Sequence, residues 1–303
     1  MKGDLATDVL KGVSRSFYLT LRLLPGPMRH GASLGYLLAR TSDTITDTTL
    51  VPVADRLALL DAYGAAVAGT GTTPAWPSHL LAAAEPKEIV LLERSAEVLA
   101  ALDQTPEAEK ALIREVLEII VSGQRLDLER FSAATPAEPV SLPDDDTVED
   151  YAWRVAGCVG AFWTKLGFLT LGERYSTAPM EELLEKGISY GKGLQLVNIL
   201  RDLPRDLAAG RCYLPVDEPW DRKALLECHA RWVEKAQAWV GEGRHYARTL
   251  PIRRLRAATV LPALLAEETL AKLQGARWAD LERRVKVPRK RVYALLWKAF
   301  LRN

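Results

Sequence analysis

Apolar residues recur every three or four positions along most of this chain, a spacing that predicts helices. No segment alternates between apolar and polar residues as a half-buried strand does, and the proline- and glycine-rich stretches between the periodic segments are short. We therefore predict an all-α fold made of one domain over residues 1–303. The periodic segments cover residues 28–48, 53–68, 86–131, 148–171, 180–201, 220–248 and 254–273.

A polar stripe interrupts the first of these apolar segments, within the sequence LARTSDTITDT. If residues 32–48 form one helix, side chains spaced by four, three and four residues share one of its faces: Tyr36, Arg40, Asp43 and Asp47. Two carboxylates one helical turn apart repel each other and are costly in apolar surroundings. The stripe is therefore either a solvated face neutralised by cations such as Arg40 or a site that binds a cation.

The same device recurs in the segment GKGLQLVNILRDLPRD. Its polar side chains are spaced by three, four and four residues: Gln195, Asn198, Asp202 and Asp206. Two D-x-x-x-D pairs offer only oxygen ligands, which suit a hard cation such as Mg²⁺ that is shared with substrate phosphates. Three arginines near the pairs supply forked hydrogen bonds for a diphosphate: Arg40, Arg201 and Arg211. The two stripes thus predict Mg²⁺-dependent diphosphate chemistry in a helical bundle.

Several other classes of function lack support in the sequence. There is no G-x-x-x-x-G-K-[ST] loop and no G-x-G-x-x-G after a strand, so a nucleotide-binding α/β fold is not indicated. The 40 lysines and arginines nearly balance the 39 aspartates and glutamates, so we expect no nucleic-acid partner. An apolar bundle with a metal-diphosphate site suits an isoprenyl diphosphate instead.

The cellular location is predicted from the cysteines and from hydropathy. The cysteines Cys158, Cys212 and Cys228 form no disulfide framework and no metal-ligand pair, so we expect buried, reduced thiols in a reducing cytoplasm. The start of the sequence lacks a signal peptide, and no apolar stretch approaches the roughly 20 residues that span a bilayer. We expect a cytoplasmic protein that is at most peripheral at the membrane.

At these motifs the sequence resembles the squalene/phytoene synthase family. The resemblance implies the all-α isoprenoid-synthase fold, a single-domain helical bundle with a central active-site cavity, and prenyltransferase activity. It is collinear over four blocks, namely SRSFYLTLRLLP at 14–25, YLLARTSDTITD at 36–47, YAWRVAGCVG at 151–160 and LQLVNILRDLPRDLAAGRCYLP at 194–215.

The resemblance also assigns roles to individual residues. The implied Mg²⁺ ligands are Asp43, Asp47, Asp202 and Asp206. The implied catalytic positions are Tyr36, Arg40, Tyr151 and Asn198. The implied substrate-binding positions are Ser14, Arg15, Gln195, Arg201, Arg211, Gly157 and Gly160. For the two glycines the lack of a side chain also permits a neighbouring helix to approach closely, and both interpretations stay open.

The product of the reaction depends on whether the protein uses NADPH. The basic segment RVKVPRK at 284–290 resembles one associated with NADPH use in squalene synthases, so Lys286, Arg289 and Lys290 are candidate ligands of a cofactor phosphate. The alternative is a solvated basic tail or a weak membrane anchor. We expect two farnesyl diphosphates to give squalene through presqualene diphosphate, with NADPH as reductant. The alternatives are dehydrosqualene or phytoene without reduction, a terpene cyclase or prenyltransferase using one diphosphate, and a catalytically inactive assembly protein.

Two local predictions concern helix ends. Pro204, inside DLPRD, should kink or end its helix, which would make the shared face of Asp202 and Asp206 approximate. The acidic run that begins at Asp144 follows Pro143 and should cap the start of a helix rather than bind metal.

Overall fold

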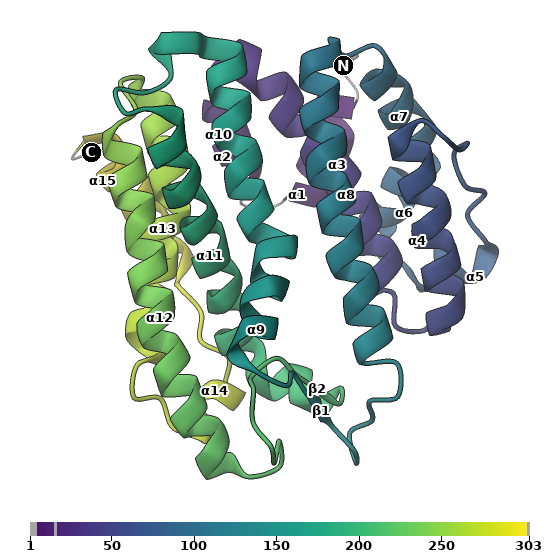
Figure 1. Ribbon diagram of the computed structural model, residues 1–303, viewed down its shortest axis with the longest axis vertical. Coiled ribbons are helices and arrows are strands. Elements are labelled where there is room, and N and C mark those ends of the chain that lie inside the picture. The colour runs from purple at the N-terminus through teal and green to yellow at the C-terminus, as the bar shows by residue number, and fades with distance from the viewer. Residues whose placement is uncertain (1–4, 15–16, 302–303) are drawn as a thin grey trace. The chain divides into compact units, whose positions relative to one another are not determined.

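The computed structural model describes residues 5–14 and 17–301, and the described residues are almost entirely helical (Figure 1). The chain divides into two compact units, unit 1 with residues 1–129 and 165–172 and unit 2 with residues 130–164 and 173–303. The all-α prediction is confirmed. The prediction of one domain stays a prediction.

Unit 1 is organised around α3 (Gly26–Asp47), on which α2, α4, α6 and α7 pack. The apolar face of α3 is fully buried and supplies Leu34, Leu37, Leu38 and Ile45 to the core. The remaining helices of the unit are η1 (Leu5–Val9), α1 (Leu10–Ser14), α2 (Phe17–Leu23), α4 (Val53–Ala68), α5 (Ser78–Ala83), α6 (Pro86–Glu93), α7 (Ser95–Asp103) and α8 (Glu107–Arg130), whose last residue belongs to unit 2.

The periodic segment 86–131 forms three helices rather than one. The chain leaves the helical conformation at Arg94, between α6 and α7, and again over the residues before α8. Pro106 explains the second break, because proline lacks the amide proton that a helix interior needs and disfavours a helical conformation at Thr105.

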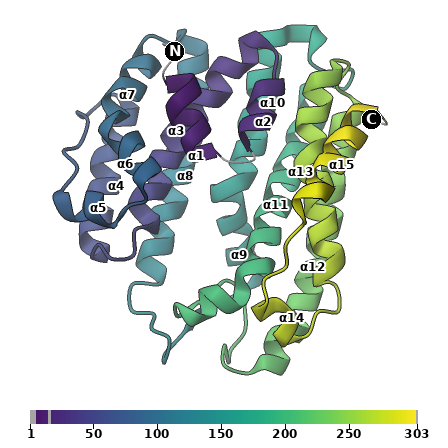
Figure 2. The ribbon, with the colours of Figure 1, turned by 180° about the vertical axis from the view of Figure 1, so that it is seen from behind.

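Unit 2 is organised around the long helix α11 (Met180–Ala208), which packs on α12 (Arg222–Arg248) and α13 (Arg253–Leu273). Figures 1 and 2 show these three helices running alongside one another. Their shared core includes Leu196, Leu200, Trp232 and Ala263. The other elements are β1 (Val140–Ser141), α9 (Asp145–Ala152), the π-helical turn η2 (Trp153–Gly157), α10 (Cys158–Leu171), which continues into unit 1 from Lys165, η3 (Gly172–Arg174), β2 (Arg211–Cys212), α14 (Trp278–Glu282) and α15 (Arg289–Leu301).

Close helix packing occupies the space beside Gly157 and Gly160. A Cβ atom on Gly160 would lie 1.9 Å from the carbonyl oxygen of Gly187, on α11. A Cβ atom on Gly157 would lie 3.0 Å from Cγ of Lys192 and 3.4 Å from the carbonyl oxygen of Ile188. Both glycines therefore permit close packing against α11, as one of the two interpretations predicted. A contact with a prenyl chain stays a prediction.

A two-stranded parallel ladder follows α11, which corrects the expectation of a chain without strands. It pairs Val140 with Arg211 and Ser141 with Cys212. The backbone N–H of Val140 donates to the carbonyl of Gly210 at 2.9 Å. This ladder fixes the backbone of Arg211 just beyond the end of α11.

Two local predictions are resolved at the helix ends. Helix α11 continues through Pro204 to Ala208, so the alternative that the helix ends at the proline is wrong. Asp144 is the N-cap of α9, where its side chain accepts a hydrogen bond from the backbone N–H of Thr147 at 2.7 Å, as predicted.

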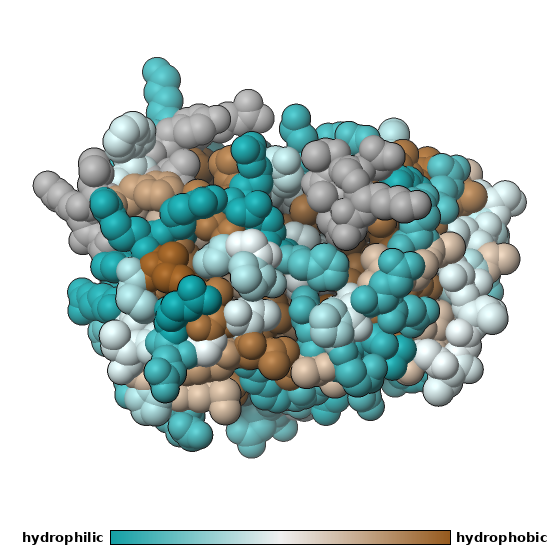
Figure 3. Space-filling model, turned by 90° about the horizontal axis from the view of Figure 1, so that it is seen from above, coloured by the Kyte–Doolittle hydropathy of each residue, from teal (hydrophilic) through white to brown (hydrophobic). Residues whose placement is uncertain are grey.

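Most large apolar side chains are buried in the core, and some are exposed at the surface. On the face shown in Figure 3, hydrophilic side chains cover much of the surface and hydrophobic ones reach it in smaller areas between them.

One helical stretch, Asp145–Arg174, is long and apolar enough to span a membrane by length and composition alone, which corrects the expectation that no stretch approaches that length. A helix packed in a protein core has the same composition, and Gly160 within this stretch is packed on α11. The three cysteines are buried, as predicted.

Candidate functional site

The first predicted stripe lies on the accessible face of α3. Tyr36, Arg40 and Asp43 are partly exposed and Asp47 is exposed, while the larger apolar residues between them are buried, namely Leu37, Leu38 and Ile45. The spacing of four, three and four residues therefore does place these side chains on one face of the helix.

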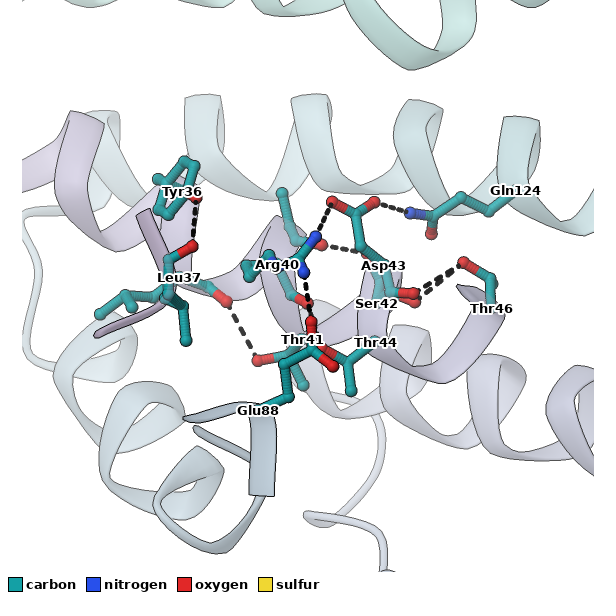
Figure 4. Close-up of polar contacts among 12 residues, drawn as sticks. Tyr36, Leu37, Arg40, Thr41, Ser42, Asp43, Thr44, Thr46, Glu88 and Gln124 are labelled. Carbon is teal, nitrogen blue, oxygen red and sulfur yellow. Dashed lines mark hydrogen bonds and ion pairs between the residues drawn. The ribbon is translucent and has the colours of Figure 1, made fainter. Parts of the chain in front are cut away.

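Arg40 lies between two carboxylates in unit 1 (Figure 4). Its guanidinium donates a hydrogen bond to Glu88 of α6, and its Nη1 lies 3.7 Å from Oδ2 of Asp43. Its Nε is buried and has no hydrogen-bond partner among the described residues. Asp47 also acts on Arg40 electrostatically, so three carboxylates favour the charged form of this one arginine.

The surroundings of Asp43 disfavour the ionised form of its carboxyl group. It accepts a hydrogen bond from Nε2 of Gln124 in α8 at 2.7 Å (Figure 4). The protein atoms packed around it, and then the Asp47 carboxylate, raise its pKa to about 7 against the opposing effect of Arg40. Although 43% of its side chain remains accessible, the ionised form is disfavoured. A divalent cation would favour ionisation, so Asp43 and Asp47 fit a metal site.

The other unit 1 residues predicted for the site lie beside α1. The hydroxyl of Tyr36 donates to the carbonyl of Val13 at 3.2 Å, and Ser14 donates to the carbonyl of Leu10. A pocket of about 300 Å³ opens beside Arg40. Its lining includes Gly12, Val13, Arg40, Lys87 and Glu88. Arg15 lies outside the described residues.

The second stripe lies on the accessible face of α11. Nδ2 of Asn198 donates to Oε1 of Gln195 at 3.4 Å. The side chains of Asp202 and Asp206 are 17% and 18% exposed. Because α11 continues through Pro204 and both aspartates are partly exposed, the two side chains still share a face of the helix.

Arginines already balance the second aspartate pair. Arg201 donates to both carboxylate oxygens of Asp202, from Nε at 3.0 Å and from Nη2 at 2.5 Å. Nε of Arg284 lies 3.4 Å from Oδ1 of the same carboxylate. Nη2 of Arg211 lies 3.5 Å from Oδ1 of Asp206. Burial disfavours the Asp202 carboxylate, but Arg201 and then Arg284 outweigh that cost, so the pKa of Asp202 lies below its ordinary value.

Arg284 is a site residue that the sequence analysis missed. It is the first residue of the basic segment RVKVPRK, in the loop between α14 and α15, and its φ of 55° places its backbone in the left-handed region. Lys286 and Lys290 of the same segment are exposed. Arg289 begins α15, and its side chain lies outside the described part of the structure. The feature of the sequence that could have identified Arg284 is its place in the basic segment RVKVPRK, which was considered only for its other basic residues.

Tyr151 belongs to a cluster of aromatic rings in unit 2. Its ring stacks on that of Tyr213 with centroids 4.9 Å apart. Phe131 meets Tyr213 edge-on at 5.1 Å. Tyr213 directly follows β2, within the quoted block that ends in RCYLP, and the sequence analysis did not single it out. The π-helical turn η2 begins two residues after Tyr151, and such turns are frequent at functional sites.

The two aspartate pairs differ in their electrostatics. No three His, Cys, Asp or Glu side chains in the described residues form a metal-ligating group, so each candidate site offers a pair of carboxylates. Mg²⁺ is commonly bound by one or two carboxylates together with water and substrate phosphates. The pair in unit 1 suits a cation, because the ionised form of Asp43 is disfavoured there and a cation would stabilise it. The arginines around the pair in unit 2 also suit an anion such as a diphosphate.

Comparisons with known proteins agree with this chemistry. The sequence profile of the squalene/phytoene synthase family matches residues 10–291. A presqualene diphosphate synthase of Zymomonas mobilis subsp. mobilis is 29% identical over 97% of this chain and 91% of its own length. A bifunctional lycopene cyclase/phytoene synthase of Phaeosphaeria nodorum is 30% identical over 69% of this chain, and the match covers 33% of that protein.

Solved structures share the fold. A complex of TcSQS with the ligand E5700 superposes with a TM-score of 0.80 at 22% identity, over 98% of this chain and 86% of that one. The squalene synthase HpnC from Alicyclobacillus acidocaldarius gives a TM-score of 0.59 at 21% identity, over 90% and 92% of the two chains. These similarities confirm the predicted isoprenoid-synthase helical fold.

Proposed function

This chain belongs to the squalene/phytoene synthase family, whose members are prenyltransferases, and from that premise we propose that it condenses two farnesyl diphosphates into presqualene diphosphate. The observation that carries the proposal is the pair of polar stripes, each with two aspartates on the accessible face of a helix that also supplies buried core residues. The similarity to the Zymomonas presqualene diphosphate synthase over nearly the whole length of both chains supports this choice of product.

The aspartates would hold Mg²⁺, which neutralises diphosphate oxygens and stabilises the departing diphosphate. The implied ligands are Asp43, Asp47, Asp202 and Asp206. Arginine N–H groups bind the same oxygens with charge-assisted hydrogen bonds. The arginines available for this role are Arg40, Arg201, Arg211 and Arg284.

The reaction itself makes one carbon–carbon bond and then closes a three-membered ring. The C1–O bond of one farnesyl diphosphate breaks, and the electron pair leaves with the diphosphate. The C2=C3 double bond of the second substrate attacks C1, and loss of a proton from that carbon closes the cyclopropane. Aromatic side chains such as Tyr151 and Tyr213 would keep water from the cation, as the stacked pair presents ring surface rather than charge.

A second candidate function is the onward conversion of presqualene diphosphate into squalene, with hydride from NADPH. The observation that favours it is the basic segment 284–290, in which Lys286 and Lys290 are exposed and accessible to a cofactor phosphate. Without reduction, proton loss from the rearranged cation would give dehydrosqualene, and the same chemistry on geranylgeranyl diphosphate would give phytoene.

The test is to incubate the purified protein with farnesyl diphosphate and Mg²⁺, with and without NADPH, and to identify the extracted products by mass spectrometry. We expect presqualene diphosphate in both incubations, and squalene only with NADPH if the second candidate holds. Dehydrosqualene without NADPH, or phytoene from geranylgeranyl diphosphate alone, would reassign the product. The absence of product from either substrate would overturn the proposal and favour an inactive assembly protein.

Two substitutions test the metal sites. We expect Asp43→Asn and Asp202→Asn each to lower turnover at least about a hundredfold. Each substitution would remove a carboxylate ligand of the Mg²⁺ that stabilises the departing diphosphate. Both variants should keep the circular dichroism spectrum of the parent protein. The control is Asp55→Asn, which changes an exposed aspartate of the same unit that pairs with His79. Normal turnover in either site variant would contradict the metal assignment.

A further inference from the structure

Positive charge is concentrated in residues 283–303. This segment holds eight of the 40 lysines and arginines and none of the 39 aspartates and glutamates, so it carries eight positive charges. The preceding 282 residues contain seven more acidic than basic residues. A chain with a net charge of +1 is therefore strongly polarised, and the basic end includes helix α15.

Among the described side chains of α15, those that contact the rest of unit 2 lie on one face of the helix. Leu295 and Ala299 are 2% and 1% exposed and join a core cluster with residues of α13. Nε of Arg291 donates to Glu268 of α13 at 3.0 Å, and Arg253 donates to the carbonyl of Phe300 at 3.1 Å. Figure 2 shows α15 lying along α13.

The opposite face of α15 carries an exposed tryptophan beside a lysine. Lys290, Ala294 and Trp297 are spaced by four and three residues and are all exposed, so they form one outward stripe. Trp297 is 68% exposed, although α15 already packs through other residues. Unlike an isolated exposed side chain, Trp297 shares its helix face with a lysine, and this combination of tryptophan and basic residues is typical of helices that lie at a membrane surface.

The surroundings of this stripe are positive. Arg253 and Arg254 are exposed at the start of α13, and Arg253 reaches the end of α15. The two acidic residues of α13 are neutralised, since Glu267 pairs with Arg244 and Glu268 pairs with Arg291. No negative charge of α13 is therefore left to oppose an anionic partner.

We infer that the outward face of α15, which includes Trp297, docks on the surface of an anionic lipid bilayer together with the arginines at the start of α13. The indole ring is stable at the boundary between headgroups and acyl chains, and lysines and arginines are attracted to anionic headgroups. A second copy of this chain is a poor occupant, because two faces of the same positive charge repel each other. The contact does not depend on the proposed reaction.

The test is flotation of the full-length protein with vesicles of phosphatidylcholine alone or mixed with phosphatidylglycerol, at low and at high NaCl. We expect binding to the mixed vesicles only, and weakening at high salt. Trp297→Ala should lower the bound fraction roughly fivefold or more, because the anchor in the interface is lost. The matched control is Trp220→Ala, which removes a tryptophan that is 64% exposed in the loop before α12.

Three outcomes would overturn the inference. The first is equal binding of the Trp297→Ala and Trp220→Ala proteins to the mixed vesicles, with both folded by circular dichroism. The second is equal binding of the parent protein to vesicles with and without phosphatidylglycerol. The third is a dimer in solution that Trp297→Ala dissociates, which would assign this face to a second copy of the chain.

Discussion

Arg284 lies with its Nε 3.4 Å from Oδ1 of Asp202, so the loop before α15 reaches a carboxylate near the end of α11. Arg201 holds the same carboxylate through both oxygens. A guanidinium has five N–H donors, and one carboxylate leaves several of them for another acceptor. Under the proposed function, the two arginines around Asp202 would use these remaining donors to bind diphosphate oxygens.

Replacing Arg284 with glycine removes the side-chain charge and preserves the backbone conformation. Glycine adopts the φ of 55° without strain, so Arg284→Gly should leave the melting temperature unchanged or higher. We expect kcat/KM for farnesyl diphosphate to fall about tenfold, which corresponds to about 1.4 kcal/mol of lost binding to the transition state. The control is Arg283→Ala, which removes the neighbouring exposed arginine at an ordinary φ of −71°. Equal rates for the two variants would mean that Arg284 has no role in the reaction.

The stack of Tyr151 on Tyr213 predicts a difference between two substitutions at residue 213. Tyr213→Phe keeps the aromatic ring and should retain most of the activity. Tyr213→Leu removes the ring on which Tyr151 stacks and which would keep water from the cation, so we expect a several-fold lower kcat. Steady-state kinetics with farnesyl diphosphate measure both variants. If Tyr213→Phe is as slow as Tyr213→Leu, the hydroxyl group rather than the ring is what matters.

The sequence predicted the two stripes because both lie on long single helices. A helix of regular period places residues spaced by three and four on one face whatever surrounds it, and α3 and α11 do this for Asp43 and Asp202. The bounds of α4 matched for the same reason, since its apolar period is uninterrupted between residues 53 and 68.

The partners of the stripes could not be predicted in this way. Glu88 and Gln124 reach α3 from helices that are far from it in sequence, and Arg284 reaches α11 from a loop. Contacts of this kind depend on tertiary packing, which leaves no periodic signal in a single sequence. The short strands β1 and β2 were missed because two residues are too few to show alternation.

The raised pKa of Asp43 predicts how stability changes with pH in metal-free protein. Its pKa is about 7 in the fold against an ordinary 3.8, so between these values the folded state binds a proton that the unfolded state has released. The free energy of unfolding should therefore fall as the pH rises from about 4 to about 7. Asp43→Asn cannot release this proton, so its stability relative to the parent protein should increase over the same range.

Urea unfolding in EDTA, from about pH 5 to about pH 8, measures this difference between the parent protein and Asp43→Asn. Asp55→Asn serves as the control, because it removes an exposed carboxylate of the same unit that lies outside the polar stripe of α3. A constant difference between the parent protein and Asp43→Asn across this range would contradict a raised pKa at Asp43.

The contact between Gly160 and Gly187 predicts opposite effects for two glycine-to-alanine substitutions. Gly160→Ala would place a Cβ atom 1.9 Å from the Gly187 carbonyl oxygen, so α10 and α11 must separate, at a cost of about 1–3 kcal/mol. Gly241→Ala, in α12, meets no atom within 4 Å and gains up to about 1 kcal/mol of helix propensity. Thermal unfolding should therefore show a lower melting temperature for the first variant and an equal or higher one for the second. A Gly160→Ala protein as stable as the parent would mean that the two helices are not packed through their backbones at this point.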